Sequence, residues 1–276
     1  KGEKKMKKFS VVVSLGMVLF AGSACAEKLP ENTLVIGMEC GYPPFNWAET
    51  TASEFNVKVE GKSFYCDGYD IQIAKRIASE MGYDLQIKQY AWEGLIPALQ
   101  SQQINAIIAG MSNTKERAKQ VAFSTNYYIS DLVAVVRQSD YATVDTLSIH
   151  DFTNKTVISQ MGTVTNTVIE QMNGAIHGTP TETFPLAATA VSTRVADALI
   201  CEYPVALDMV QNDSSLKIIH FSDGFVVEDE NQLGVAVAVN KKETDLLEKI
   251  NEALLKISHE EQQQIMEEVI LRRNGE

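Results

Sequence analysis

The chain of 276 residues carries 36 acidic and 24 basic residues, a net charge of −12. So acidic a chain argues against nucleic acid or an anionic membrane surface as a partner and favours solubility in an open compartment. At this length a single core is close to its upper size, so two lobes of about 100 to 150 residues each are expected.

The first 26 residues have the order of features of a secretory signal peptide. Two lysines follow Met6, the expected start, and an apolar stretch occupies 11–20. Ala24 and Ala26 then provide the small residues of a cleavage site. Removal of this segment, which holds five lysines and one glutamate, would take the net charge from −12 to −16. The protein is therefore expected to be exported to the periplasm.

Two alternatives exist for the N-terminal segment. It could stay as a membrane anchor, but its apolar stretch is shorter than the roughly 20 residues that a transmembrane helix needs. Cys25 could carry a lipid, but a lipobox has a large aliphatic residue three positions earlier, where Gly22 stands. Cleavage after Ala26 fits better than lipid attachment.

The first half of the chain alternates apolar runs with helical spacing. This pattern predicts strands separated by helices, and hence a parallel sheet with helices on its faces. The two prolines after the first strand force a loop, and the polar segment 47–63 is expected to be an inserted loop. Strands are expected at 34–38, 85–87, 104–109 and 132–136, and helices at 70–82 and 95–99.

The second half restarts the same alternation. No flexible linker separates the halves, because the junction near Ser130 runs into strand-like sequence, so a stiff hinge of crossing strands is expected. The domains are placed at 27–130 with 229–276 for the first lobe and at 131–228 for the second. Strands are expected at 156–159, 197–201, 216–220 and 233–239, and helices at 164–172, 204–210, 243–257 and 259–271.

Three cysteines follow the signal segment. Cys40 and Cys66 flank the polar insertion, so a disulfide between them would pin it, although the sequence leaves their pairing open. Cys201 lies in an apolar run and is expected to be a buried, small apolar residue.

The sequence contains no recognisable motif for catalysis, metal binding or phosphate binding. A glycine-rich nucleotide loop and a nucleophile elbow are both missing from it. No cofactor, metal or catalytic residue is therefore predicted. The four histidines are scattered, without ligand spacing, at His150, His177, His220 and His259.

One segment that leads from a strand into a helix contains the groups that a carboxylate-binding site needs. The strand at 104–109 leads into a helix start, where free backbone N–H groups favour anions. Ser112 and Thr114 add hydroxyl groups there, and Arg117 can make a planar, two-pronged contact to a carboxylate. The alternative is a capped helix with a solvated arginine.

An ordered set of motifs at matching spacing resembles the polar-amino-acid family of periplasmic solute-binding proteins of ABC transporters (family 3 type). The match runs over nearly the whole exported chain, and its specificity lies in the order of the motifs. The resemblance implies a two-lobed periplasmic-binding-protein type II fold, each lobe a mainly parallel sheet flanked by helices, with two crossing strands between them. The motifs are Tyr42-Pro43-Pro44-Phe45, Gly68-Tyr69-Asp70, Trp92–Leu99, Gly110–Arg117, Phe123-Ser124, Gly162-Thr163 and Asp197-Ala198 with Glu202.

The resemblance also implies how the backbone groups of a bound amino acid are held. Arg117 and Ser112 should bind the α-carboxylate, and the backbone of Gly110 should face the α-ammonium group. From the second lobe, Thr163 and Val164 should offer backbone N–H groups to the same carboxylate.

The family usually has aspartate where this chain has Glu202, the residue that should accept from the ammonium group. The extra methylene implies a slightly shifted ligand or a bridging water. For the ligand side chain, Tyr42 and Trp92 stand where the family places aromatic rings, and Glu39 stands where some members read a basic group. Each ring could instead belong to the core, and Glu39 could be a solvated loop charge.

The expected function is capture of a free amino acid, with arginine, lysine or glutamine as the favoured ligands. Two lobes would close over it about the hinge, and a monomer would deliver it to an ABC permease. The rival hypotheses are a dehydratase-like enzyme on the same fold, with Glu39 or Glu202 transferring protons, and a sensor that presents its ligand to a receptor.

Overall fold

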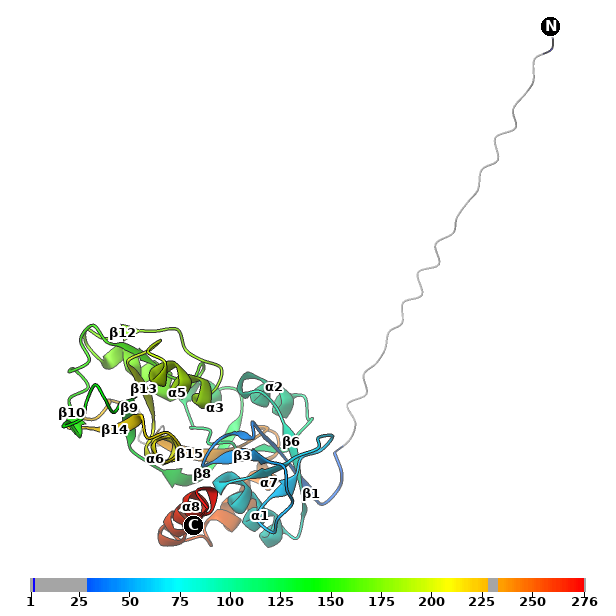
Figure 1. The fold of residues 1–276 in the computed structure, drawn as a ribbon. Helices are drawn as coiled ribbons and strands as arrows, with labels where there is room; N and C mark the ends of the chain where they lie inside the picture. The colour runs from blue at the N-terminus through cyan, green and yellow to red at the C-terminus, as the bar shows by residue number, and fades with distance from the viewer. Residues whose placement is uncertain (1, 3–28, 228–232, 276) are drawn as a thin grey trace.

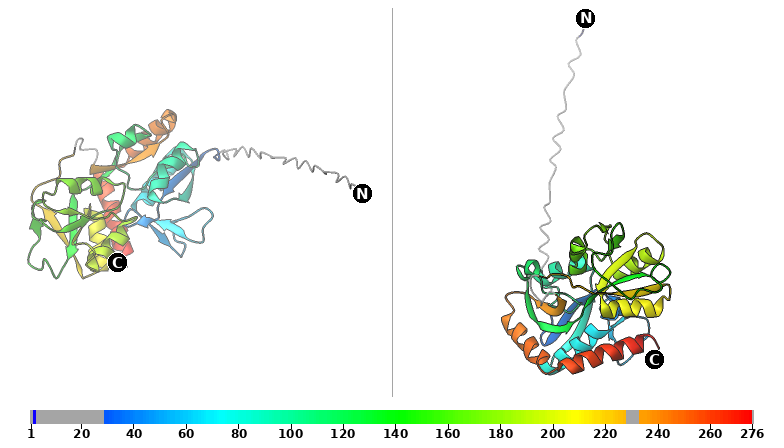
Figure 2. Two further views of the ribbon diagram at one scale, coloured as in Figure 1. Left: turned by 90° about the horizontal axis from the view of Figure 1, so that it is seen from above. Right: turned by 90° about the vertical axis from the view of Figure 1, so that its left-hand side faces the viewer.

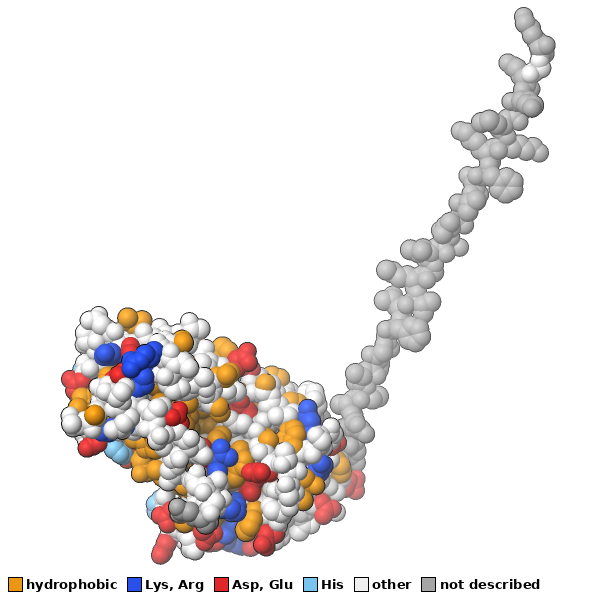
Figure 3. All heavy atoms as spheres, viewed as in Figure 1, with side chains coloured by type: hydrophobic (Ala, Val, Ile, Leu, Met, Phe, Trp, Pro, Cys, Tyr) orange, Lys and Arg blue, Asp and Glu red, His pale blue; other side chains and the backbone are white. Residues whose placement is uncertain are grey.

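In the computed structural model, residues 2, 29–227 and 233–275 are described. The expected signal peptide, its cleavage site and Cys25 lie outside the described residues. Within these ranges, no helix combines the length and the apolar character that a membrane crossing requires. Acidic side chains are scattered over both halves of the face shown in Figure 3.

The first lobe is built on a five-stranded sheet. The sheet is mixed: β1 is parallel to both of its neighbours, whereas β15 is antiparallel to both of its own. In order across the sheet, the strands are β6 (Asp84–Gln89), β1 (Thr33–Met38), β7 (Ala106–Ile107), β15 (Gly234–Val239) and β8 (Ala122–Ile129). Its helices are α1 (Tyr69–Met81), α2 (Leu95–Gln100), α3 (Lys115–Ala118), α7 (Thr244–Leu254) and α8 (His259–Arg273).

The second lobe holds a six-stranded sheet. Three of its pairs are parallel, and the two pairs that involve β9 are antiparallel. The strands in spatial order are β10 (Thr146–Leu147), β14 (Leu216–Phe221), β9 (Leu132–Arg137), β13 (Ala198–Glu202), β11 (Thr156–Ile158) and β12 (Ile176–His177). The helices of this lobe are α4 (Val164–Thr167), α5 (Phe184–Ser192) and α6 (Tyr203–Asn212).

The two lobes lie side by side, and β8 and β9 join them directly (Figure 1). Only Ser130 and Asp131 separate the end of β8 in one sheet from the start of β9 in the other. The chain returns to the first lobe between β14 and β15. We propose the boundaries 27–130 with 229–276 and 131–228 for the two lobes, because the strands of each large sheet fall within them.

Most of the expected helices and strands are present. Helix α1 has the predicted spacing and ends at Gly82, whose φ of 65° suits a glycine at the C-cap. The helix expected at 164–172 consists of α4 followed by a 3-10 turn at Val168–Gln171. Helix α5 was not indicated by the apolar pattern, although Thr183 caps it by accepting from Leu186 N.

The polar insertion contains two strands, so the prediction of a loop over 47–63 was wrong. A small antiparallel sheet forms here from β2 (Gly41–Tyr42), β3 (Asn46–Glu49), β5 (Tyr65–Asp67) and β4 (Val57–Lys58), in that order. Backbone pairing builds these short strands without an apolar alternation in the sequence, because the hydrogen bonds join main-chain groups. The disulfide between Cys40 and Cys66 ties this sheet to the end of β1.

The Cys40–Cys66 disulfide is expected to contribute about 3 kcal/mol to the free energy of unfolding, because it closes a long loop in the unfolded chain. The two cysteines are 26 positions apart. Urea unfolding of a Cys40→Ser, Cys66→Ser double variant should show this loss. Cys201→Ala is the control, since Cys201 is buried and unpaired, as predicted. A double variant as stable as the wild type would contradict this contribution.

The C-terminal helix α8 contacts both lobes. It packs on α1 and β8 of the first lobe and touches α6 of the second. Figure 2 (right) shows it running along the underside of the molecule from one lobe to the other. Near its end, Arg273 forms an ion pair with the buried Asp208 of α6 and lies 4.9 Å from the centre of the Trp47 ring.

Candidate functional site

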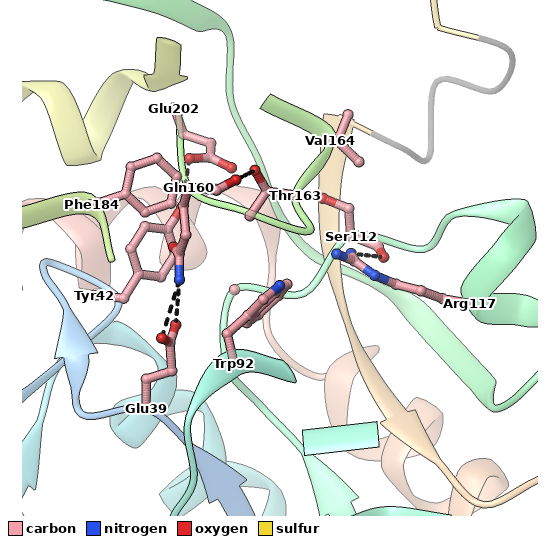
Figure 4. A pocket seen from close by; sticks show the side chains of 11 residues that line it. Glu39, Tyr42, Trp92, Ser112, Arg117, Gln160, Thr163, Val164, Phe184 and Glu202 are labelled. Carbon is pink, nitrogen blue, oxygen red and sulfur yellow. Dashed lines mark hydrogen bonds between the residues drawn. The ribbon is translucent and has the colours of Figure 1, made fainter. Parts of the chain in front are cut away.

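A cavity lies between the two lobes (Figure 4). All nine residues that the sequence nominated for ligand binding line it, and two further residues join them. The lining consists of Glu39, Tyr42, Trp92, Gly110, Ser112, Arg117, Gln160, Thr163, Val164, Phe184 and Glu202.

The lining residues come mostly from the segments that follow the carboxyl ends of the central strands. Glu39 follows β1, Gly110 follows β7, Gln160 follows β11 and Glu202 ends β13. Because these ends of the two sheets face each other, side chains from both lobes meet in one place, where α/β proteins commonly bind ligands.

Arg117 reaches from α3 into the cavity and spans the two lobes. Its Nη1 donates to Ser112 O at 2.9 Å, and its Nη2 donates to Gly162 O of the second lobe at 2.9 Å. Thr114 does not line the cavity, because its hydroxyl caps α3 by accepting from the Arg117 backbone N–H. Arg117 also lies over the ring of Trp92, 5.0 Å from its centre.

The pKa of the Arg117 guanidinium group is lowered by burial. Loss of solvent lowers its pKa to about 10, while nearby Glu93 and Glu202 act in the opposite direction. The guanidinium group stays charged at neutral pH. It is therefore a partly desolvated, permanent cation, which is the group that binds a carboxylate most strongly.

Glu202 faces the cavity from the second lobe and contacts the first. Tyr42 OH donates to Glu202 Oε2 over 2.6 Å. Burial raises the pKa of Glu202, and the hydrogen bond from Tyr42 and the charge of Arg117 partly offset this rise. The longer side chain of glutamate places its carboxylate within reach of the Tyr42 hydroxyl.

Both faces of the Tyr42 ring are covered by other rings. Phe45 stacks on it with a centre-to-centre distance of 5.0 Å, and Phe184 of the second lobe stacks on it at 4.9 Å. Tyr42 thus presents its hydroxyl to the cavity in this arrangement. Trp92 is half-buried and offers the other aromatic surface of the lining.

Glu39 and Gln160 meet across the cleft. Gln160 Nε2 donates to the two carboxylate oxygens of Glu39 at 3.2 and 3.4 Å and to Glu182 O at 2.9 Å. Burial raises the pKa of Glu39 to about 7; the bond from Gln160 lowers it and nearby Glu93 raises it further. Glu39 is therefore a partly buried carboxyl group inside the cleft rather than a solvated loop charge.

Sequence reasoning missed Gln160 and Phe184. Gln160 directly follows the strand expected at 156–159, so the rule that located Ser112 could have nominated it too. Phe184 opens α5, and the only sign of that helix was Thr183 followed by Pro185, a capping residue and an early proline. Among the described residues, no group of three or more histidine, cysteine or acidic side chains could hold a metal ion.

Comparison with known proteins gives relatives along most of the chain. The arginine-binding extracellular protein ArtP of Bacillus subtilis is 27% identical over 259 residues, which cover 90% of this chain and 92% of ArtP. The L-cystine-binding protein TcyJ of Escherichia coli is 25% identical over 249 residues, or 89% of this chain and 85% of TcyJ.

Solved structures show the same fold. The substrate-binding protein AbpA of Streptococcus pneumoniae, bound to L-arginine, superposes with a TM-score of 0.73 at 27% identity, covering 89% of this chain and 97% of AbpA. An ancestral arginine-binding protein bound to glutamine gives a TM-score of 0.68 at 29% identity, covering 90% of this chain and 100% of that one. These likenesses confirm the expected type II fold of periplasmic binding proteins.

The model of one family matches residues 34–271, from the first strand to the last helix. The order of the motifs, the two-lobed fold and the cavity between the lobes agree with this match. The chain belongs to the bacterial extracellular solute-binding proteins, family 3.

Proposed function

We propose that the protein binds a free amino acid with a basic or polar side chain, of which arginine, lysine and glutamine fit best. The observation that carries this proposal is the placement of two opposite charges in one cavity. Figure 4 shows Arg117 and Glu39 on different sides of the cavity, with Trp92 between them. Arginine-binding relatives and an arginine-bound structural neighbour support the same class of ligand.

Each part of an amino acid has a chemical partner in the lining. Arg117 and the hydroxyl of Ser112 suit the α-carboxylate, with the backbone N–H groups of Thr163 and Val164 on the other side. Glu202 suits the α-ammonium group. We assign these residues a role in binding and no role in catalysis.

The side-chain end of the cavity combines charge with a flat surface. Glu39 supplies a carboxylate and Gln160 an amide, and both can pair with a guanidinium, an ammonium or an amide group. Trp92 supplies an aromatic face on which a cation can stack. This end therefore favours basic and amide side chains over acidic ones.

Hinge closure is the proposed mode of capture. Hydrogen bonds between four pairs of residues join one lobe to the other: Tyr42 with Glu202, Gln160 with Glu39, and both Arg117 and Trp92 with Gly162. They supply the contacts that hold the lobes together, and the β8–β9 crossing supplies a short hinge. We propose that the exported protein acts as a monomer and presents its closed form to an ABC permease.

A Glu39→Gln variant should lose affinity for arginine and lysine by roughly 10- to 100-fold, because a charge-assisted hydrogen bond contributes about 1.5 to 3 kcal/mol. Its affinity for glutamine should change by less than about threefold, since an amide can replace the carboxylate as acceptor. A thermal-shift screen of the twenty amino acids followed by calorimetry measures both.

Glu93→Gln is the matched control for this measurement. It removes the same charge from an exposed neighbour that does not line the cavity. The proposed selectivity would be refuted if Glu39→Gln weakened the binding of every amino acid equally, or if the wild type bound only acidic amino acids.

A further inference from the structure

A carboxylate lies buried behind the wall of the ligand cavity. Asp70, in the first turn of α1, has no exposed surface. It accepts a hydrogen bond from Tyr127 OH at 2.7 Å and another from Asn46 Nδ2 at 2.8 Å. Tyr127 and Asn46 are also fully buried. The carboxylate is therefore held rigidly by two neutral donors and does not line the cavity itself.

Tyr127 connects this carboxylate to Gly110, which does line the cavity. The Gly110 backbone N–H donates to Tyr127 OH at 3.0 Å, and the backbone of Gly110 also interacts with the Asp70 carboxylate. Gly110 has a φ of 62°, and a Cβ added there would lie 2.5 Å from Tyr42 Cε1. The wall at this point is thus bare backbone, fixed from behind by Asp70 and Tyr127.

Asp70 has no cationic partner in the ion pairs of the described residues. The titratable groups that interact with it electrostatically are the hydroxyls of Tyr42, Tyr69 and Tyr127. Burial raises the pKa of Asp70 to about 7, while the bonds from Tyr127, Asn46 and Gly110 lower it. A buried carboxylate without a counter-charge is costly, so a cation placed beside Gly110 would be stabilised.

We propose that Asp70 is a positioning residue, which fixes the Gly110 backbone through Tyr127 and supplies a second negative charge behind the α-ammonium group of the bound amino acid. The inference rests on the proposed function, and it adds a residue to the recognition of the ammonium group. Glu202 faces that group from the second lobe, while Asp70 acts from inside the first lobe.

The test uses two ligands that differ in the α-ammonium group alone. L-Arginine and 5-guanidinopentanoate form this pair, and L-lysine with 6-aminohexanoate is the corresponding pair if lysine binds more tightly. Asp70→Asn keeps the shape of the side chain and removes its charge. We expect this variant to bind L-arginine at least about tenfold more weakly, and the deamino analogue within about threefold of the wild type, by calorimetry at neutral pH.

Asp67→Asn is the matched control. Asp67 is a second buried aspartate three positions earlier, but it pairs with Arg272 and does not line the cavity. This control should leave the ratio of the two dissociation constants unchanged. If Asp70→Asn does not fold, Tyr127→Phe replaces it in the test, because it cuts the connection to Gly110 while the charge of Asp70 stays. Tyr127→Phe should also weaken the binding of L-arginine more than the binding of the deamino analogue.

Two outcomes overturn the inference. One is an equal loss of both ligands, which would mean that Asp70 supports the fold and does not recognise the ammonium group. The other is unchanged binding of L-arginine in the variants, which would leave the proposed function intact. A wild type that binds no amino acid is a different result, since it would refute the proposed function itself.

Discussion

Replacement of Arg117 by alanine should weaken amino-acid binding by about 30-fold or more, since loss of one partner of a desolvated charge pair costs about 2 to 5 kcal/mol. Arg117 is the cation of the lining, and its guanidinium group bridges Ser112 and Gly162. Without it, a ligand carboxylate would enter a cleft with no compensating charge. Calorimetry with the best ligand of the thermal-shift screen measures the loss.

The Arg117→Lys variant separates charge from geometry. Lysine keeps the positive charge but lacks the planar fork that bonds a carboxylate at two points. Its affinity should fall between those of the wild type and Arg117→Ala. Circular dichroism should show folded protein in both variants, because α3 is a short helix with no buried residues. Unchanged affinity in Arg117→Ala would remove this residue from the site.

The second large effect is expected at Glu202. Glu202→Gln should weaken amino-acid binding by roughly 10- to 100-fold, because it removes the charge that pairs with the α-ammonium group, worth about 1.5 to 3 kcal/mol. Glu202→Asp should keep most of the affinity, since it restores the residue that the family usually has at this position. Both variants are measured with the same ligand.

Tyr42→Phe is the control for the Glu202 variants. It removes the hydroxyl that donates to Glu202 and keeps the ring stacked between Phe45 and Phe184. Glu202→Gln should therefore weaken binding far more than Tyr42→Phe does. Equal, small effects of the two substitutions would show that the carboxylate contacts the tyrosine and not the ligand.

The parts of the site that sequence could locate belong to single segments. Ser112 and Arg117 follow one buried strand and share one capped helix start, so local rules place both in the same neighbourhood. Glu202 sits at the end of an apolar strand for the same reason. The ordered motifs then predicted the class of ligand, which cannot be inferred from the periodicity of strands and helices alone.

The parts that sequence could not locate depend on how two lobes meet. Gln160 reaches Glu39, and Phe184 covers Tyr42, only when the second lobe faces the first. No spacing along the chain encodes these contacts, because the partners lie more than 100 positions apart. The short strands at 47–63 were not predicted for another reason, because main-chain pairing needs no apolar pattern in the sequence.

The contact between α8 and α6 has a consequence for the motion of the lobes. Arg273 belongs to a helix packed on the first lobe and Asp208 to a helix of the second, so their ion pair links the lobes in addition to the β8–β9 hinge. A rotation about that hinge must slide or separate this pair. The ion pair therefore stabilises the arrangement in which the two lobes are held together, and opening of the cleft has to overcome it.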